Sequence, residues 1–253
     1  MAESTSPTLV LHKAVAVMNC FLPDNTPLGL TAIQRATGFP MSTAKRILES
    51  LVAEGLVIRR DQSYHLGPYV MVWAAAVRRG SDVVSLSEPV LESVRDSCGE
   101  TVTLNVRHRL NRVCIRQLRG TSQINYDPAV GEVIPLQAGS SSKVMLAFDK
   151  ALAEQVIAQG LTAFTESTIV DPEAFREDLA LVRKLGYAIA RDETAVGVSS
   201  IGAPIFDSQG EVAAVIVIGG PSFRCTRVWL EGQADGLREA GLRVSRLLGW
   251  AGG

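Results

Sequence analysis

The sequence predicts an α+β protein, with a small helical unit followed by an antiparallel sheet that has helices at both ends. Three observations support this fold class. Residues 31–66 read as two short amphipathic helices around a tight turn, followed by a hairpin. After residue 100 the hydrophobic period changes from that of a helix to that of a strand. The later strand candidates are joined by short turns, which favours an antiparallel sheet over a doubly wound parallel one.

The helix pair carries recognisable start and stop signals. Thr31 and Gln34 have the spacing of a capping box, so we expect the first helix to begin at Thr31. Gly38 allows positive φ, and Pro40 disfavours helical geometry before it, so a sharp turn follows. We expect Ser42 to cap the second helix. The apolar face of that helix recurs at spacings of three and four and comprises Ala44, Ile47, Leu48, Leu51 and Val52.

The opposite face of the second helix is polar, which suits contacts to phosphates and base edges in a major groove. Residues 56–58 and 64–66 read as a two-stranded wing around a polar turn, with two arginines near its tip. The helix pair alone fits an ordinary helical hairpin with a solvated charged face equally well. The added basic wing favours a winged helix-turn-helix that binds DNA. The candidate DNA contacts are Arg35, Ser42, Thr43, Lys45, Arg46, Arg59, Arg60 and Tyr64.

The charge distribution agrees with an acidic partner for the first part of the chain. The 253 residues are 47% hydrophobic and 20% charged, which is typical of a folded protein. The formal net charge is −1, but residues 1–80 carry eight Lys or Arg against five Asp or Glu, leaving +3 there and −4 in the remainder. An acidic partner, such as double-stranded DNA, therefore fits the first part better than the second.

Cysteine and histidine usage gives no sign of a metal site or another cofactor. The four cysteines form no C-x-x-C pair, and the three histidines lie far apart. Scattered cysteines of this kind are typical of reduced core residues in the cytoplasm. No secretory leader is visible, and the apolar runs 70–77 and 212–218 are too short to span a bilayer, so we expect a cytoplasmic protein with no membrane partner.

The order of elements divides the chain into three parts. A helix over residues 8–21 should pack on the helix pair, and a helix from Pro68 to Arg79, closed by Gly80, should link the two domains and favour a dimer. The expected parts are a DNA-binding domain over 8–67, a linker helix over 68–80 and a third domain over 81–250.

The third part mixes helices and strands. We expect helices over 86–98 with Pro89 in the first turn, over 144–157, over 172–185 with Asp171 as cap, and over 227–248. The expected strands are a hairpin over 101–106 and 113–118, two short strands over 124–126 and 133–136, and three strands over 187–190, 198–206 and 212–218.

Three stretches carry a resemblance to a known family: LGLTAIQRATGFPMSTAKRILESLVAEGLVIRRDQSYHLGP, GEVIPLQAGSSSKVMLAF and TIVDPEAFREDLALVRKLGYAIARDETAVGVSSIGAPIFDSQGEVAAVIVIGGPSFR. In this order they resemble the IclR family of bacterial transcriptional regulators, from about residue 8 to about residue 248. The resemblance implies a winged helix-turn-helix, a dimerising linker helix and a GAF-like effector-binding domain. It also implies homodimers, or dimers of dimers forming homotetramers, on operator DNA.

The resemblance also implies a pocket for a small organic or aromatic acid. Consecutive serines at a helix start suit a carboxylate, although the alternative that they only cap and pack the helix stays open. Gln137 stands where many relatives have His, and Val217 and Gly219 stand where some acid-binding members have serines, which implies a less polar pocket. By position, the pocket comprises Leu136, Gly139, Ser140, Ser141, Asp192, Ser199, Ser200, Val217 and Gly219.

Two other functions compete with this interpretation. Ser140 to Lys143 contains the S-x-x-K pattern of serine acyl enzymes, but no S-D-N or K-T-G motif follows, so we do not expect an enzyme. A GAF-like metabolite-sensing or dimerising protein that does not bind DNA is the closer alternative. The sequence favours a ligand-responsive, DNA-binding transcriptional regulator, a repressor, whose operator binding a small organic or aromatic acid controls.

Overall fold

The computed structural model describes residues 9–22, 26–80 and 82–252. The chain divides into two compact units, residues 1–80 and 81–253, and each is α+β in composition. The expected domain starts at residues 8 and 81 lie outside the described residues. None of the described helices is both long and apolar enough to cross a membrane.

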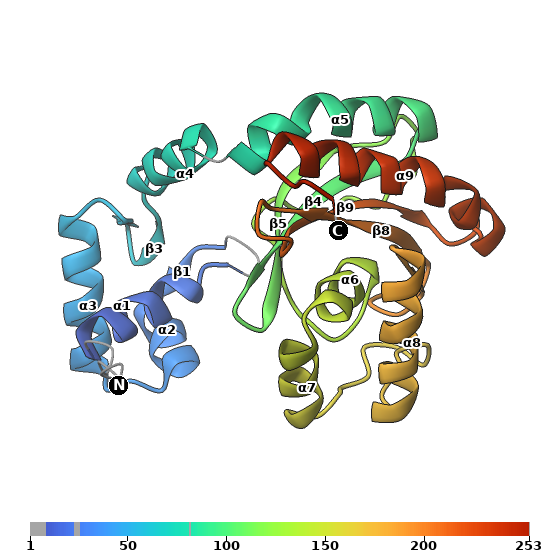
Figure 1. Ribbon diagram of the computed structural model, residues 1–253. Helices are drawn as coiled ribbons and strands as arrows, with labels where there is room; N and C mark the ends of the chain where they lie inside the picture. Colours follow the sequence, from blue (N-terminus) through green and yellow to red (C-terminus); the bar gives the residue numbers. More distant parts are fainter. Residues whose placement is uncertain (1–8, 23–25, 81, 253) are drawn as a thin grey trace. The chain divides into compact units, whose positions relative to one another are not determined.

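The N-terminal unit is a helical bundle with a small sheet (Figure 1), and this sheet has three strands. Strand β3 lies between β1 and β2, and all pairs are antiparallel. Val17, Ile33, Leu48 and Val57 are fully buried between the helices and the sheet. The elements are α1 (Leu9–Asn19), β1 (Leu28–Gly29), α2 (Leu30–Thr37), α3 (Met41–Ala53), β2 (Val57–Arg60), β3 (Ser63–Leu66) and α4 (Tyr69–Gly80).

Both predicted helix caps are wrong, although the helices themselves are confirmed. Helix α2 begins at Leu30 directly after β1, so Gly29 is the cap residue and Thr31 lies inside the first turn. Helix α3 begins at Met41 after Pro40, and neither helix has a side-chain cap. Pairing of Gly29 with β3 and the fixed φ of Pro40 set these starts in place of hydroxyl caps.

The turn between the two helices follows the prediction. Gly38 has φ +68°, and its N–H donates to the carbonyl of Gln34 over 2.9 Å. The apolar face of α3 is buried at four of its five predicted positions. Val52 is the exception at 37% exposed.

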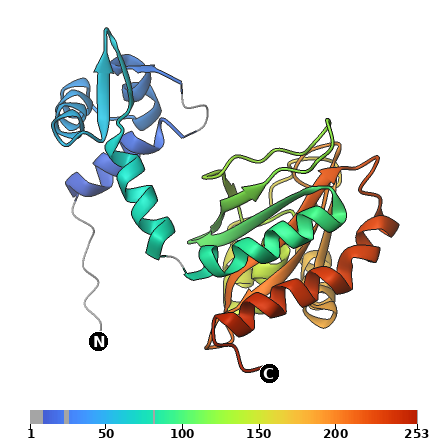
Figure 2. The same cartoon turned by 90° about the horizontal axis from the view of Figure 1, so that it is seen from above.

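The C-terminal unit is one six-stranded antiparallel sheet with helices on both faces (Figures 1 and 2). The strand order is β6-β5-β4-β9-β8-β7, so β4 and β9 lie at the centre. Its helices are α5 (Asp82–Cys98), α6 (Ser140–Phe148), α7 (Lys150–Ala158), α8 (Pro172–Leu185) and α9 (Arg227–Leu247). Its strands are β4 (Thr101–His108), β5 (Asn111–Leu118), β6 (Val133–Pro135), β7 (Ala188–Arg191), β8 (Val198–Phe206) and β9 (Val212–Pro221).

The two faces of this sheet bury separate cores. On β9, Ile216 and Ile218 pack under α5 and α9, whereas Val215 and Val217 pack against α6, α7 and α8. This is the period-two alternation of a strand that is covered on both faces. Figure 1 shows α5 and α9 side by side on one face and α6, α7 and α8 on the other.

Three predictions for this unit need correction. Helix α5 begins at Asp82, so Pro89 lies in its middle and not in its first turn. Residues 124–126 form no strand, because Asn125 instead bonds the carbonyls of Gly120 and Ser122 within a loop. The helix expected over 144–157 is two helices, which begin earlier at Ser140 and break at Asp149, the cap of α7.

Candidate functional site

The polar face of α3 is open to solvent in the N-terminal unit. Ser42, Lys45 and Arg46 are exposed, and Thr43 is half-buried. The Lys45 Nζ lies 3.8 Å from Glu49 Oε1, and both side chains are 61% exposed. A pair this long and this exposed is weak, so Lys45 stays available to another anion.

The wing presents two cations on a short hairpin. Arg59 lies opposite Tyr64 and Arg60 opposite Ser63, and both arginines are exposed beside the turn at Asp61, whose φ is +52°. Tyr64 is only 6% exposed, which argues against the contact to the DNA backbone that we predicted for it. Its ring instead lies under the Arg59 guanidinium at 5.9 Å and supports it.

Arg35 is the remaining candidate DNA contact. It is exposed in the last turn of α2, the helix that precedes the turn into α3. The structure therefore leaves every predicted polar contact except Tyr64 at least partly accessible.

A small cavity lies at the N-terminus of α6 in the C-terminal unit. Its volume is about 20 Å³. Five of the predicted effector residues line it: Gly139, Ser140, Ser141, Ser200 and Val217. The other lining residues, which sequence reasoning missed, are Thr103, Asn105, Arg112, Tyr126, Pro128, Thr194 and Val198.

Four predicted effector residues do not line this cavity. Leu136 is 1% exposed in the core beneath α6. Asp192 accepts hydrogen bonds from the Gly197 N–H and the Ser222 hydroxyl, each 2.7 Å long, so it holds two loops together.

Ser199 and Gly219 are the other two predicted effector residues that do not line the cavity. Ser199 is adjacent to Ser200 on β8 and therefore faces the opposite side, where its hydroxyl bonds that of Ser222. Gly219 lies against the Tyr126 ring, because a Cβ at Gly219 would be 3.1 Å from Tyr126 Cδ1. Its lack of a side chain makes room for that ring.

The first turn of α6 brings hydroxyls to the cavity. The Ser140 and Ser200 hydroxyl oxygens are 2.8 Å apart, and the cap residue Gly139 has no side chain to occupy the helix end. Gly139 has φ +86° and ψ 156°, a conformation that only glycine adopts readily. A helix N-terminus carries partial positive charge, so this end of the cavity favours an anion.

Arg112 of β5 provides a full positive charge in the same cavity. Its side chain is buried, and its Nη1 donates to Asn105 Oδ1 over 3.3 Å. The Nε has no hydrogen-bond partner, and among the described residues no carboxylate forms an ion pair with Arg112. A buried cation without an anionic partner is costly, which makes Arg112 the group in this unit that most requires an anion.

Tyr126 covers the cavity from the loop between β5 and β6. Burial raises the pKa of its hydroxyl, and nearby Glu132 adds to that effect, while the charge of Arg112 and a hydrogen bond with it act in the opposite direction. Tyr126 therefore stays neutral near pH 7 and serves the cavity as a hydrogen-bonding hydroxyl.

The S-x-x-K pattern does not form a catalytic pair. The Lys143 Nζ lies 2.7 Å from Glu193 Oε1 and donates to the carbonyl of Ile189, whereas the Ser140 hydroxyl bonds Ser200. Lys143 thus has no contact with the serine that it would have to activate. Among the residues that the structure describes, no cluster of three potential metal ligands occurs either.

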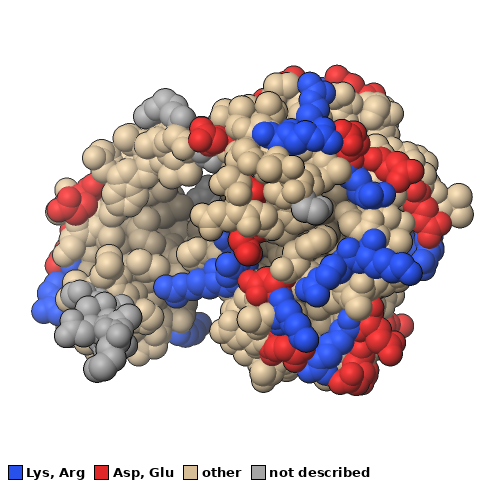
Figure 3. Space-filling model, viewed as in Figure 1, with Lys and Arg blue, Asp and Glu red and all other residues tan. Residues whose placement is uncertain are grey.

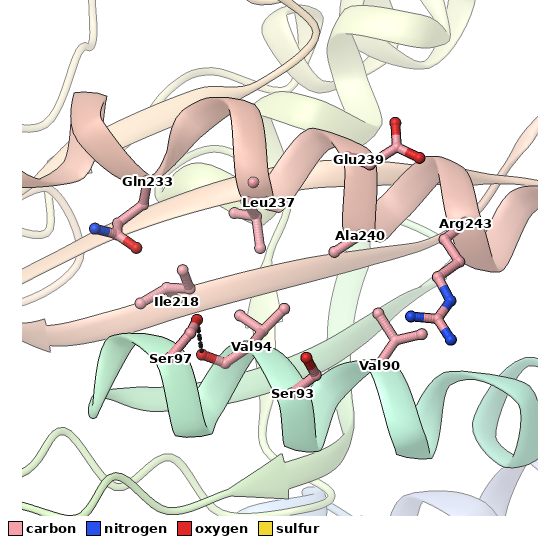
Figure 4. Close-up of a pocket in the computed structure, with 11 residues that line it drawn as sticks. Val90, Ser93, Val94, Ser97, Ile218, Gln233, Leu237, Glu239, Ala240 and Arg243 are labelled. Carbon is pink, nitrogen blue, oxygen red and sulfur yellow. Dashed lines mark hydrogen bonds between the residues drawn. The ribbon is translucent and has the colours of Figure 1, made fainter.

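A larger groove of about 240 Å³ lies on the other face of the sheet, between α5 and α9. Figure 4 shows Val90, Val94 and Leu237 along it, with Glu239 and Arg243 at one end. The Ser97 hydroxyl donates to the Val94 carbonyl within its own helix, so it is already satisfied. This groove offers no group comparable to Arg112.

Comparisons with known proteins agree with both units. The family model of the IclR helix-turn-helix domain matches residues 10–61, and that of the bacterial transcriptional regulator IclR C-terminal domain matches residues 75–246. The HTH-type transcriptional repressor AllR of Escherichia coli K12 is 30% identical over 243 residues, which covers 94% of this chain and 90% of AllR.

Two solved structures match this chain along most of its length. An IclR-type regulator from Alicyclobacillus acidocaldarius is 25% identical with a TM-score of 0.87, covering 95% of this chain and 99% of that one. An IclR homolog from Microbacterium hydrocarbonoxydans, complexed with 4-hydroxybenzoate, is 26% identical with a TM-score of 0.81, covering 94% and 98%.

These matches confirm the predicted α+β fold and the predicted role of a DNA-binding transcriptional regulator. The alternative of a sensor without a DNA-binding domain fails, because the helix-turn-helix model matches the first unit. The prediction that the chain is not an enzyme is also confirmed, since both family models and AllR describe transcriptional regulators. The chain belongs to the IclR family of bacterial transcriptional regulators.

Proposed function

We propose that this regulator is a repressor whose operator binding is controlled by a small organic acid, and that the acid binds in the cavity at the N-terminus of α6. The observation that carries this proposal is the buried Arg112, which lines that cavity and has no ion pair among the described residues. The repressor assignment follows AllR, which is a repressor in Escherichia coli.

The lining groups suit a carboxylate better than a neutral ligand. Arg112 offers a planar fork of N–H donors whose spacing matches two carboxylate oxygens. The start of α6 and the hydroxyls of Ser140 and Ser200 lie in the same cavity. The Microbacterium homolog is complexed with 4-hydroxybenzoate, which is also a carboxylate. Val198, Val217 and Pro128 supply apolar walls for the rest of such a molecule.

Binding requires the cavity to enlarge. A volume of about 20 Å³ holds little more than a water molecule. Arg112, Val217 and Ser140 sit on β5, β9 and α6, whereas Tyr126 and Pro128 sit on the loop between β5 and β6. We therefore expect that loop to move when an acid enters. A ligand that favours the enlarged state shifts the equilibrium between DNA-binding and released forms.

The DNA-binding arrangement is a dimer or a dimer of dimers acting in the cytoplasm. Exposed apolar side chains line α4 and need a partner surface: Tyr69, Met71, Val72, Trp73 and Val77. Pairing through this linker helix would place two copies of α3 in successive major grooves. In each copy Ser42, Thr43, Lys45 and Arg46 would contact bases or phosphates, and Arg35, Arg59 and Arg60 the flanking backbone.

Calorimetry with matched ligands tests the effector site. We expect benzoate or 4-hydroxybenzoate to bind the full chain and benzamide, which has the same shape without the charge, not to bind. Glyoxylate is titrated as well, to test whether the site takes a small aliphatic acid in place of an aromatic one. Arg112→Met should weaken binding roughly tenfold or more, because a hydrogen-bonded charge is lost.

Arg119→Met is the matched control, because Arg119 is exposed directly after the last residue of β5 and does not line the cavity. The affinity of the Arg119→Met variant for the acid should equal that of the wild type. Equal binding of benzamide and benzoate, or an Arg112→Met variant with wild-type affinity, would contradict the proposed site.

A further inference from the structure

A buried ion pair between Lys143 and Glu193 contacts the first turn of α6. Lys143 is 2% exposed, and its Nζ donates to Glu193 Oε1 over 2.7 Å. The other oxygen of Glu193, Oε2, accepts the N–H of Gly139 over 3.1 Å. The Lys143 N–H in turn donates to the Gly139 carbonyl. One carboxylate therefore joins the cap residue of α6 to a lysine one turn into the same helix.

The same pair is anchored to three other elements. Lys143 also donates to the Ile189 carbonyl of β7 over 2.7 Å and lies 3.1 Å from Asp178 Oδ2 of α8. The Glu193 carbonyl accepts the Thr168 hydroxyl from the loop before α8. The end of α6 is thus fixed against β7, α8 and two loops by polar contacts that are almost wholly buried.

The residues joined by this ion pair line two different hollows of the C-terminal unit. Gly139, which it holds, lines the effector cavity. Lys143, Asp178 and Glu193 line a separate groove of about 270 Å³ on the outer side. The restraint acts at a flexible position, because Gly139, at a φ of +86° and a ψ of 156°, has no side chain to hold it in one conformation.

We propose that Lys143 and Glu193 are positioning residues for the effector cavity: their ion pair fixes the Gly139 amide and the first turn of α6 in the geometry that receives the acid. The pair does not touch the ligand. It sets the direction of the helix end and of the Ser140 hydroxyl, so its loss costs affinity without removing any ligand contact. This inference rests on the proposed effector function.

The test uses two variants of the full chain. Lys143→Met removes the cation and leaves Glu193 buried and unpaired, which can unfold the unit. The double variant Lys143→Met/Glu193→Gln removes both charges of the pair while keeping the side-chain volumes. Asp178 also loses its cation, but its side chain is 25% exposed in the groove and can be solvated there, so the double variant is the one that should fold. In the double variant no ammonium group remains to hold the side chain that accepts the Gly139 N–H.

Two measurements are made on each protein. Hydrogen exchange of the peptide covering residues 137–143, without ligand, reports the restraint itself, and we expect it to quicken at least fivefold in the double variant. Calorimetry with benzoate reports the consequence, and we expect the affinity to fall roughly tenfold. Affinity of the same variant for DNA without acid should not change.

Glu88→Gln is the control for loss of an ion pair as such, because Glu88 pairs with Arg116 between α5 and β5, away from the cavity. It should lower the thermal midpoint without changing exchange at 137–143 or benzoate affinity. Unchanged exchange and affinity in the double variant would overturn the inference. If the wild type binds no acid, the effector proposal fails by itself, and the exchange experiment still decides whether the pair restrains α6.

Discussion

The two units of this chain place their positive charges in opposite ways. In the N-terminal unit Lys45, Arg46, Arg59 and Arg60 are exposed on one helix and one hairpin. In the C-terminal unit Arg112 is buried without an ion pair among the described residues. The visible surface of that unit mixes positive and negative side chains, as Figure 3 shows.

This difference in burial indicates which kind of anion each unit can bind. Exposed cations on rigid elements suit a large polyanion that stays in solvent, because phosphates need only approach the surface. A buried guanidinium suits one small anion that is stripped of water on entry. On the proposed function, the DNA-binding unit and the effector-binding unit therefore divide the recognition of anions by size.

The largest expected effect tests the exposed half of this comparison. Lys45→Ala/Arg46→Ala should weaken binding to a duplex from upstream of the gene that encodes this chain by roughly 100-fold or more. A contact of this kind contributes about 1–3 kcal/mol, and the proposed dimer would lose it in both half-sites. Fluorescence anisotropy at constant salt measures this loss, and size-exclusion chromatography should show an unchanged oligomer.

The matched control removes two cations from α9 of the other unit. Arg243→Ala/Arg246→Ala changes net charge equally and should leave DNA affinity within about twofold, since neither arginine belongs to the helix-turn-helix or its wing. A comparable loss of affinity in both double variants would show that net charge, and not the α3 surface, drives binding.

A substitution at Gly139 tests the buried half of this comparison, and we expect a smaller effect from it. Gly139→Ala forces a side chain into a positive-φ conformation, where its Cβ would lie 3.0 Å from Thr194 Cγ2. We expect the free energy of unfolding to fall by about 1–3 kcal/mol and benzoate binding to weaken. Urea unfolding of the full chain, followed in the C-terminal unit, measures the change.

Gly236→Ala provides the control for this substitution. Gly236 lies within α9, and a Cβ there would meet nothing within 4 Å. The alanine should stabilise the helix by about 0.5–1 kcal/mol without affecting ligand binding. If both alanines stabilised the protein, the strained conformation of Gly139 would be refuted.

The sequence predicted the exposed polar face of α3 more completely than the cavity at the start of α6, and the reason is geometric. The polar face of α3 follows from helical period within one segment, so Lys45 and Arg46 could be placed without the fold. The caps at Thr31 and Ser42 were wrong because a strand pairing and a proline decide where those helices begin.

The cavity depends on pairing between distant strands. Asn105 and Arg112 of the β4–β5 hairpin meet Ser200 of β8 in one cavity only because β4 pairs with β9 and β9 pairs with β8. No local pattern marks Tyr126, since its loop has no regular structure. Asp192 and Ser199 were transferred by resemblance, and the structure shows them in a neighbouring network with Ser222.

The most direct test of the account measures operator binding as the acid is added. Wild type and Arg112→Met are titrated onto the labelled upstream duplex at one salt concentration, with and without the carboxylate that binds by calorimetry. The account predicts equal DNA affinity for both proteins without acid, and at least roughly tenfold weaker binding with acid for the wild type only, the range of ordinary allosteric coupling. An acid response that survives in Arg112→Met, or no response in the wild type, would contradict it.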